Sequence, residues 1–317
     1  REFGQVSGDR ANWESHWEEI AERVIPSYSK SFTSRGESRT EGEKRTEHLF
    51  DSTAAVALGR FAAVVDSLLT PMNQKWHRLV ATNTDLNRNR AVRAWFEEAT
   101  NVLFRYREGP KANFRSQNHE NYRMLGAFGT GTMFIDQLKG APGLRYRAVH
   151  LGEIYFQENH QGIIDRSWRR FQLTGRQMNQ KWPSTLPDKI KTTLENSPHK
   201  KWWVLHCVKP RAEVDPGRLD YRGMTFVSYY VALDCKEILE EGGFQTFPYA
   251  ISRYWQSPGE SYGRSPAMDV LPAIKTLNEE KKTILKQGHR VVDPVLLLPD
   301  DGVLDSFSLK PGAMNTG

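Results

Sequence analysis

The feature of the sequence that most constrains its fold is a change of hydrophobic period near residue 126. Before that point, apolar residues recur every three or four positions, which is the period of amphipathic helices. From residue 132 onward apolar and polar positions alternate, as they do in strands that bury one face. Because helices come first and strands follow, the chain is predicted to fold as an α+β protein with antiparallel strands.

The first 125 residues predict four amphipathic helices. The first is expected to be capped by Asn12, to bury Trp17 and to stop at Pro26. The others are expected at 51–70, 87–107 and 114–125, and the polar segment 29–47 is predicted to be a long loop or mobile arm. The back face of the first helix is acidic and carries Glu14, Glu18, Glu19 and Glu22.

The middle of the chain, residues 126–264, predicts strands with two short helices among them. One short helix is capped by Thr174 and the other begins near Pro187. The predicted strands are 132–135, 144–149, 153–157, 163–171, 202–208, 225–232 and 249–254.

The glycine-rich stretch GAFGTGT at 126–132 could suggest a phosphate-binding loop. Such a loop needs a strand before it, a helix after it and a lysine before Ser or Thr. Here a predicted helix precedes the glycines, a predicted strand follows them, and no lysine is present. The stretch is therefore interpreted as a helix C-terminus that turns tightly into a strand.

A long helix is predicted late in the chain, from Ser265 or Asp269 to about Lys286, with Gly288 ending it. Two short strands, 295–298 and 303–307, are expected after it, and no matching helix follows. Its apolar stripe of Ile274, Leu277 and Ile284 is interrupted by Lys281, which fits a closed monomeric core poorly. We therefore expect the helix to stand against copies of itself in a ring, with these three apolar residues at the interface.

The charge is modestly basic, with 44 Lys and Arg against 38 Asp and Glu, a net charge of +6. Basic residues gather in the region 88–123 and along the late helix, where they could contact phosphates without reading sequence. Glutamates lie among them, so the favoured interpretation of each patch by itself is a solvated, ion-paired helix face.

No catalytic, metal or cofactor site is predicted. His150, Glu153, Glu158, His160 and Asp165 lie at strand ends and turns, where charged residues are ordinarily solvated, and they lack the spacing of a metal site.

Cys207 and Cys235 form neither a disulfide framework nor a metal motif, so both are interpreted as buried thiols of a protein assembled in a reducing cytosol. The longest apolar runs have five residues, whereas a membrane-spanning helix needs about 20.

Several short segments, taken together and in order, resemble the portal (head-to-tail connecting) proteins of short-tailed, T7-like bacteriophages. The resembling segments are DSTAA at 51–55, LTPMNQKWHRL at 69–79, the turn at 126–132, TGRQM at 174–178, FPYAISR at 247–253, GESYGRSP at 259–266, the helix through Leu277 and Asn278, VDPV at 292–295 and PG at 311–312.

The resemblance implies a dodecameric ring at one capsid vertex, through which double-stranded DNA is packaged and later ejected. Residues 1–264 would be the wing, helical to 125 and β-rich from 126; residues 265–288 would be a stem helix and 289–317 the beginning of a clip. Family members continue beyond this point, so the chain is expected to be truncated. The implied partners are the major capsid protein, terminase and a tail adaptor, in a virion assembled in the bacterial cytoplasm, with no membrane involved.

A DNA conduit must hold its cargo weakly, so sparse cations balanced by acids suit it better than a strongly basic cleft. The predicted channel residues are Lys275, Lys281, Lys282 and Lys286. Two other classes stay open at this level: an enzyme acting on nucleic acid, such as a nuclease or terminase part, and a capsid scaffold without a channel. Ring symmetry would separate a portal from a scaffold, and metal-dependent cleavage would indicate the enzyme.

Overall fold

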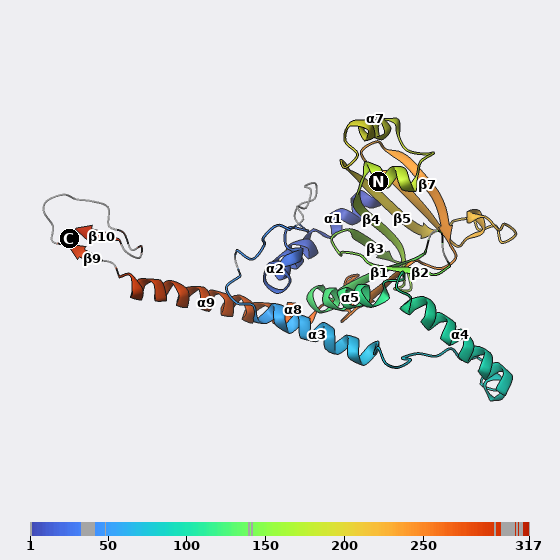
Figure 1. Ribbon diagram of the computed structural model, residues 1–317, viewed down its shortest axis with the longest axis horizontal. Helices are drawn as coiled ribbons and strands as arrows, with labels where there is room; N and C mark the ends of the chain where they lie inside the picture. Colours follow the sequence, from blue (N-terminus) through green and yellow to red (C-terminus); the bar gives the residue numbers. More distant parts are fainter. Residues whose placement is uncertain are drawn as a thin grey trace.

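Two antiparallel sheets with flanking helices form the body of the molecule, and two long helices project from it (Figure 1). The structure is a computed structural model that describes residues 2–32, 42–47, 49–138, 140, 142–294, 296–298, 308, 310 and 313–316. Mixed helix and antiparallel sheet confirm the predicted α+β class.

The N-terminal helix predicted from Asn12 is two helices, α1 (Glu2–Asp9) and α2 (Ala11–Val24). The prediction of an Asn12 cap was wrong, because Arg10 separates the two helices and Asn12 lies within α2. The buried guanidinium of Arg10 donates to Glu14 Oε1 at 2.8 Å and to the carbonyl of Leu151 at 3.0 Å. This ion pair draws the first turn of α2 against the body.

The back face of α2 is less solvated than its acidic sequence indicates. Glu14 is buried where it pairs with Arg10. Glu18 is also buried, and its carboxylate accepts hydrogen bonds from the main-chain N–H groups of Lys30 and Phe32, the latter at 3.1 Å. Of the four acidic residues, Glu14 thus holds Arg10 before α2, and Glu18 holds the chain that follows α2. That chain begins with the short 3-10 helix η1 (Pro26–Tyr28).

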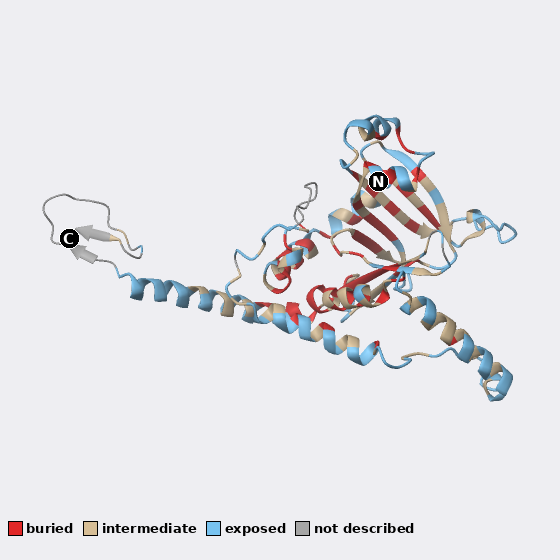
Figure 2. Ribbon diagram, in the orientation of Figure 1, coloured by how far each residue is buried: buried red, intermediate tan, exposed pale blue. Residues whose placement is uncertain are grey.

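The next three helices agree with the predicted ones in place and type. Asp51 Oδ1 accepts the N–H of Thr53 at 2.9 Å and starts the first of them, and Asn89 accepts the N–H of Ala91 at 2.9 Å to start the second. They are α3 (Thr53–Leu69), α4 (Arg90–Glu108), which follows η2 (Leu86–Arg88), and α5 (Phe114–Phe128). Only α5 is largely buried, whereas α3 and α4 leave most of their surface in solvent (Figure 2).

The glycine-rich turn is confirmed as a helix end that leads into a strand. Gly129 follows α5 with φ of +73°, a left-handed conformation that glycine adopts without strain. A Cβ there would lie 2.4 Å from the carbonyl oxygen of Gly263 and 2.4 Å from the carbonyl carbon of Arg264. The turn therefore needs glycine for its backbone angle and for its close approach to the main chain of Gly263 and Arg264.

Eight strands form the two antiparallel sheets of the body. The smaller sheet has the order β2-β1-β8, and the larger has the sequential order β3-β4-β5-β6-β7. All seven predicted strands are present; β7 was missed because its sequence EILEEGGF is acidic and glycine-rich and it lies at the sheet edge. The strands are β1 (Thr130–Gln137), β2 (Leu144–Ala148), β3 (Ile154–Glu158), β4 (Ile164–Thr174), β5 (Lys201–Pro210), β6 (Phe226–Ala232), β7 (Glu237–Phe244) and β8 (Tyr249–Arg253).

Both short helices between the strands are confirmed. Thr174 and Gln177 form a reciprocal capping box that starts α6 (Gly175–Lys181), and Pro187 precedes α7 (Asp188–Asn196). These helices cover one end of the larger sheet through a second apolar cluster that includes Met178, Ile190 and Trp202. A further 3-10 turn, η3 (Tyr221–Gly223), precedes β6.

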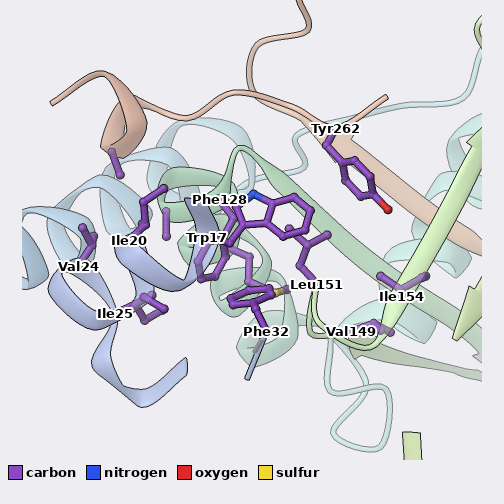
Figure 3. Packing of buried hydrophobic residues seen from close by; sticks show 14 of the residues in the cluster. Trp17, Ile20, Val24, Ile25, Phe32, Phe128, Val149, Leu151, Ile154 and Tyr262 are labelled. Carbon is purple, nitrogen blue, oxygen red and sulfur yellow. The ribbon is translucent and has the colours of Figure 1, made fainter. Parts of the chain in front are cut away.

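The main core joins α2, α5, the strands and the root of the late helix. Trp17 is fully buried, and its ring lies 5.0 Å from that of Tyr262 and 5.5 Å from that of Phe32, while Phe128 closes the cluster from α5 (Figure 3). Burial of such large aromatic side chains supplies most of the stability here. Cys207 and Cys235 are free, half-buried thiols, and burial raises the pKa of Cys207 to about 11.

Of the two predicted starting points of the late helix, Ser265 is confirmed, whereas Asp269 ends a short first helix and caps nothing. Ser265 caps a short helix α8 (Pro266–Asp269), and after Val270 the chain continues as α9 (Leu271–Val292). The prediction that Gly288 ends the helix was wrong, since a helical glycine costs only about 1 kcal/mol relative to alanine. Beyond it, β9 (Leu296–Leu298) pairs in parallel with β10 (Met314–Thr316), and the predicted strand 303–307 lies outside the described residues.

Candidate functional site

Helix α9 leaves the body as a long arm that is fixed only at its base (Figure 1). Its 22 residues correspond to about 33 Å of helix. At the base, Lys275 Nζ donates to Glu19 Oε1 of α2 at 2.7 Å, and Asn278 Oδ1 accepts the N–H of Phe50 at 2.8 Å. From residue 279 to residue 294 nearly every side chain is exposed (Figure 2). The structure thus presents the distal two thirds of the helix to whatever surrounds the subunit.

An apolar groove of about 360 Å³ lies where the base of α9 runs beside α3. Ile274 and Leu277 line it from α9, and Leu58 and Phe61 line it from α3. Ile284 lies farther along α9, outside the groove, and is 61% exposed. The structure therefore brings two of the three predicted interface residues together and leaves the third on the free part of the arm.

The four predicted channel lysines fall into two groups. Lys275 is held by Glu19, and Lys282 forms an ion pair with Glu279 at 3.1 Å within α9. Lys281 and Lys286 are exposed, and neither forms an ion pair with any residue that the structure describes. These two lysines are therefore the ones whose positive charge is most available to an anionic partner.

Helices α3 and α4 expose far more apolar surface than their amphipathic sequences predict. Leu68 and Leu69 at the end of α3 are 73% and 59% exposed, Met72 is 77% exposed, and Trp95 of α4 is 65% exposed. Large exposed apolar side chains on projecting helices mark surfaces made for association with another protein.

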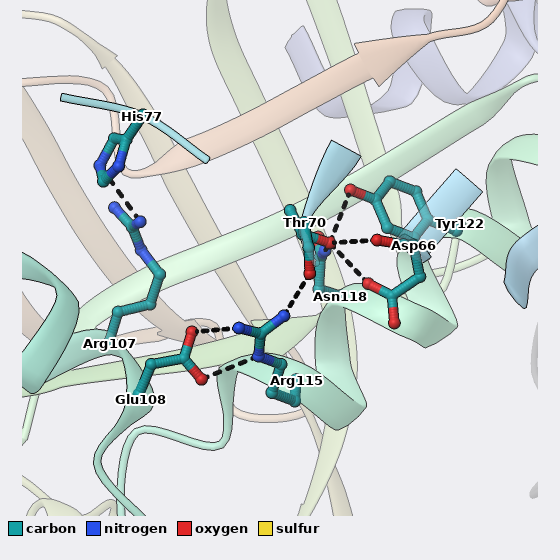
Figure 4. A network of polar contacts seen from close by, with 8 residues as sticks. All are labelled: Asp66, Thr70, His77, Arg107, Glu108, Arg115, Asn118 and Tyr122. Carbon is teal, nitrogen blue, oxygen red and sulfur yellow. Dashed lines mark hydrogen bonds and ion pairs between the residues drawn. The ribbon is translucent and has the colours of Figure 1, made fainter. Parts of the chain in front are cut away.

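A polar network fixes the end of α3 and the end of α4 to α5 (Figure 4). The Thr70 hydroxyl lies 3.3 Å from that of Tyr122 and accepts from Asn118 at 3.2 Å. Arg115 donates to the Thr70 carbonyl and forms a two-pronged ion pair with Glu108 at 2.7 and 2.8 Å. Helices α3 and α4 are therefore each fixed to α5 at one end, even though their outer surfaces are exposed.

Half of the eight Lys and Arg residues of the region 88–123 have local partners in the described structure: Arg88, Arg107, Arg115 and Arg123. Arg115 pairs with Glu108, and Arg123 pairs with Glu120 at 3.0 Å. Arg107 stacks on Trp76 and lies 3.2 Å from His77, whose pKa is lowered by burial and by this guanidinium. These contacts support the interpretation of an ion-paired helix face for Arg88, Arg115 and Arg123, and leave Arg90, Arg93, Arg105 and Lys111 without an ion pair in the described structure.

The candidate acid/base cluster is not assembled into a reactive centre. The His150 ring stacks on Tyr28 at 4.5 Å, Glu153 pairs with Arg169 at 2.9 Å, and Glu158 pairs with Arg253. Glu158, His160 and Asp165 share an open surface hollow. Within the described part of the chain, no three His, Cys, Asp or Glu side chains gather closely enough to hold a metal ion. No helix there has the length and apolar composition to cross a membrane.

A rigid body that carries projecting helices with exposed apolar and basic residues defines a structural subunit of an assembly. The chain belongs to the bacteriophage head to tail connecting protein family, whose model matches residues 1–316. It is 29% identical over 321 aligned positions to a probable portal protein of Bordetella phage BPP-1 and 26% identical over 321 positions to the portal protein of Salmonella phage epsilon15. These alignments cover 99% and 98% of this chain but 56% of each relative.

Proposed function

We propose that this chain forms part of a phage portal subunit that assembles into a dodecameric ring at one capsid vertex. The observation that carries the proposal is the match of the connector family to residues 1–316. Two relatives named portal proteins, aligned over nearly the whole chain, support it. We propose further that the phage is short-tailed and T7-like, on the strength of the sequence segments described above.

Within such a subunit, residues 1–264 would form the wing, with its helices before residue 125 and its sheets after residue 126. Residues 265–288 would be the stem helix, and residues 289–317 would begin the clip. The projection of α9 from a closed body supports this division, although the helix itself runs to Val292. Ile274, Leu277 and Ile284 would contact the neighbouring subunit or help to fix the helix at its base.

The channel would carry double-stranded DNA without binding it tightly. Lys281 and Lys286 are the principal candidates to face DNA, with Lys275 and Lys282 nearer to acidic partners. A few cations per subunit, repeated around a ring, would guide phosphates while leaving the DNA free to move. The major capsid protein would surround the ring, and terminase and then a tail adaptor would dock on the clip of a virion assembled in the host cytoplasm.

Imaging of the complete gene product tests the proposal directly. We expect single particles with twelvefold symmetry and an open axial channel. A monodisperse monomer, or a closed assembly without a channel, would overturn the portal assignment. Incubation of the same particles with supercoiled DNA and Mg²⁺ separates the enzymatic alternative, because a structural conduit leaves the DNA uncut.

A further inference from the structure

A cavity of about 210 Å³ lies in the body, beside the larger sheet and apart from α9. Arg147 of β2 and Arg170 of β4 line it, together with Ser31 from the segment after α2 and Trp203 of β5. Residues from the two sheets and from the N-terminal segment thus meet around one cavity that is partly open to solvent.

The cavity lies where β4 extends beyond the end of its neighbour β3. Strand β3 begins at Ile154, opposite Arg169, and the last main-chain bond on this side runs from the N–H of Arg170 to the carbonyl of Glu153 at 2.7 Å. In the described chain no strand pairs with β4 beyond this bond on that side, and Gln172 lines the cavity there. Main-chain polar groups of β4 therefore line the cavity together with the side chains.

The acidic residues of the cavity are already neutralised by other cations. Glu14 pairs with Arg10 at 2.8 Å, and Glu153 pairs with Arg169 at 2.9 Å. Lys30 is the one lysine among the residues that line the cavity, and it pairs with Glu43 at 2.7 Å. This leaves the two positive charges of Arg147 and Arg170, neither of which forms an ion pair with a described residue.

Two buried donors of the cavity lack an acceptor in the described structure. They are Nε of Arg170 and the hydroxyl of Ser31. The Arg170 guanidinium lies 4.1 Å from the centre of the Trp203 ring, which holds its plane in place. Arg147 is an exposed residue of β2; partial burial of its guanidinium and then the like charge of Arg169 lower its pKa, and the carboxylate of Glu153 opposes this shift. The Nε group of Arg170 and the Ser31 hydroxyl are buried donors that an anion would satisfy, and Arg147 presents a second guanidinium to the same cavity.

We propose that this cavity binds a phosphate group between Arg147 and Arg170, with the Ser31 hydroxyl as a further donor. Two guanidinium groups that form no ion pair with a described residue match the charge of a phosphate dianion, and their planar forks match its oxygens. The phosphate can come from a free phosphate or nucleotide, or from a DNA backbone. The site lies within one subunit, so it does not depend on ring formation.

Isothermal titration of the whole protein with inorganic phosphate at constant ionic strength tests the site. We expect saturable binding that Arg147→Gln and Arg170→Gln each weaken by about tenfold or more, as the loss of a charge-assisted bond requires. Arg166→Gln is the matched control, because Arg166 is an exposed arginine of the same strand outside this cavity. Absence of saturable binding, or an equal loss in the control, would overturn the proposal.

A second measurement keeps the test valid if a variant fails to fold. Phosphate should raise the melting temperature of the unaltered protein more than chloride does at equal ionic strength, because a ligand stabilises the state that binds it. Competition then identifies the source: displacement of phosphate by dAMP alone indicates a free phosphate monoester, and displacement by a short DNA duplex indicates backbone phosphate. Equal melting temperatures in phosphate and chloride would contradict the site.

Discussion

The hydroxyl of Ser265 donates a hydrogen bond of 2.8 Å to the main-chain carbonyl of Ala127, 138 positions earlier in the chain. The same oxygen accepts the N–H of Met268 at 3.1 Å and so caps α8. One buried side chain thus joins the last turn of α5 to the root of the arm. The direction in which α9 leaves the body depends on this joint.

Replacement of Ser265 by alanine should destabilise the protein by about 1–3 kcal/mol, because it removes a helix cap and leaves a buried carbonyl without its donor. Urea unfolding measures the change. Ser52→Ala is the matched control, since Ser52 precedes α3 but its side chain makes no capping bond. It should change stability by less than about 0.5 kcal/mol. Equal losses in the two variants would show that the joint contributes nothing.

Replacement of Gly129 by alanine should be far more damaging than the same change at Gly162. Both glycines have positive φ, +73° and +76°, so each alanine costs about 1–2 kcal/mol for the left-handed backbone alone. A Cβ at residue 162 meets open space, whereas at residue 129 it collides with main-chain atoms at 2.4 Å. Thermal unfolding should therefore show a much larger drop for Gly129→Ala, and similar drops would argue against the close packing of this turn.

Sequence periodicity predicts the class, the order of the elements and most of their bounds, because burial of one face controls both helices and strands here. It failed where tertiary contacts decide. Glu14 and Glu18 are charged yet buried, since Arg10 and two main-chain N–H groups meet them only in the folded chain. Trp95 is apolar yet exposed, and no single-chain pattern separates a core face from an assembly face.

Helical periodicity also predicted part of the candidate site. The lysines and the apolar stripe of α9 could be read from helical spacing, but their pairing could not. Glu19 lies 256 positions from Lys275, so only the fold shows that this lysine forms an ion pair. The Arg147 and Arg170 cavity left no pattern in the sequence, because its walls come from β2, β4, β5 and the segment after α2.

The buried histidine of β5 should make stability depend on pH. His206 bonds to the hydroxyls of Tyr249 at 2.7 Å and Ser228 at 2.9 Å, and its ring stacks on Tyr230 at 4.1 Å. Burial first, and then the charges of Lys181 and Arg169, lower its pKa well below 6.5. The folded state therefore holds the ring neutral, whereas the unfolded state takes up a proton near pH 6.5.

Since the unfolded chain binds more protons below pH 6.5, the contribution of His206 is fully present above that pH and is lost as the pH falls. The slope from this one group approaches about 1.4 kcal/mol per pH unit. Urea unfolding of His206→Gln between pH 7.5 and 5.5 should show a flatter dependence than the unaltered protein. His160→Gln, at an exposed histidine, should keep the original slope. An unchanged slope in His206→Gln would contradict the assignment.

The exposed apolar residue on the arm should matter for assembly and not for folding. Under the proposed ring, Ile284→Asp should shift the particle mass toward monomers, because it places a charge in an apolar contact. Its melting temperature as a monomer should stay unchanged, since Ile284 is 61% exposed within the subunit. Thr283→Asp, an exposed neighbour on α9, is the control and should still assemble. Mass photometry of both variants measures the outcome.

The free lysines of α9 should affect DNA movement and leave the ring intact. Lys281→Glu combined with Lys286→Glu reverses the two charges that form no ion pair with a described residue, so phosphates passing the helix would meet repulsion in every subunit. We expect DNase-protected genome content per particle to fall by about threefold or more, with ring symmetry unchanged in images. Lys191→Glu is the control, because Lys191 belongs to α7, which lies far from α9 on the other side of the body (Figure 1). Normal packaging and ejection by the double variant would remove these lysines from the channel.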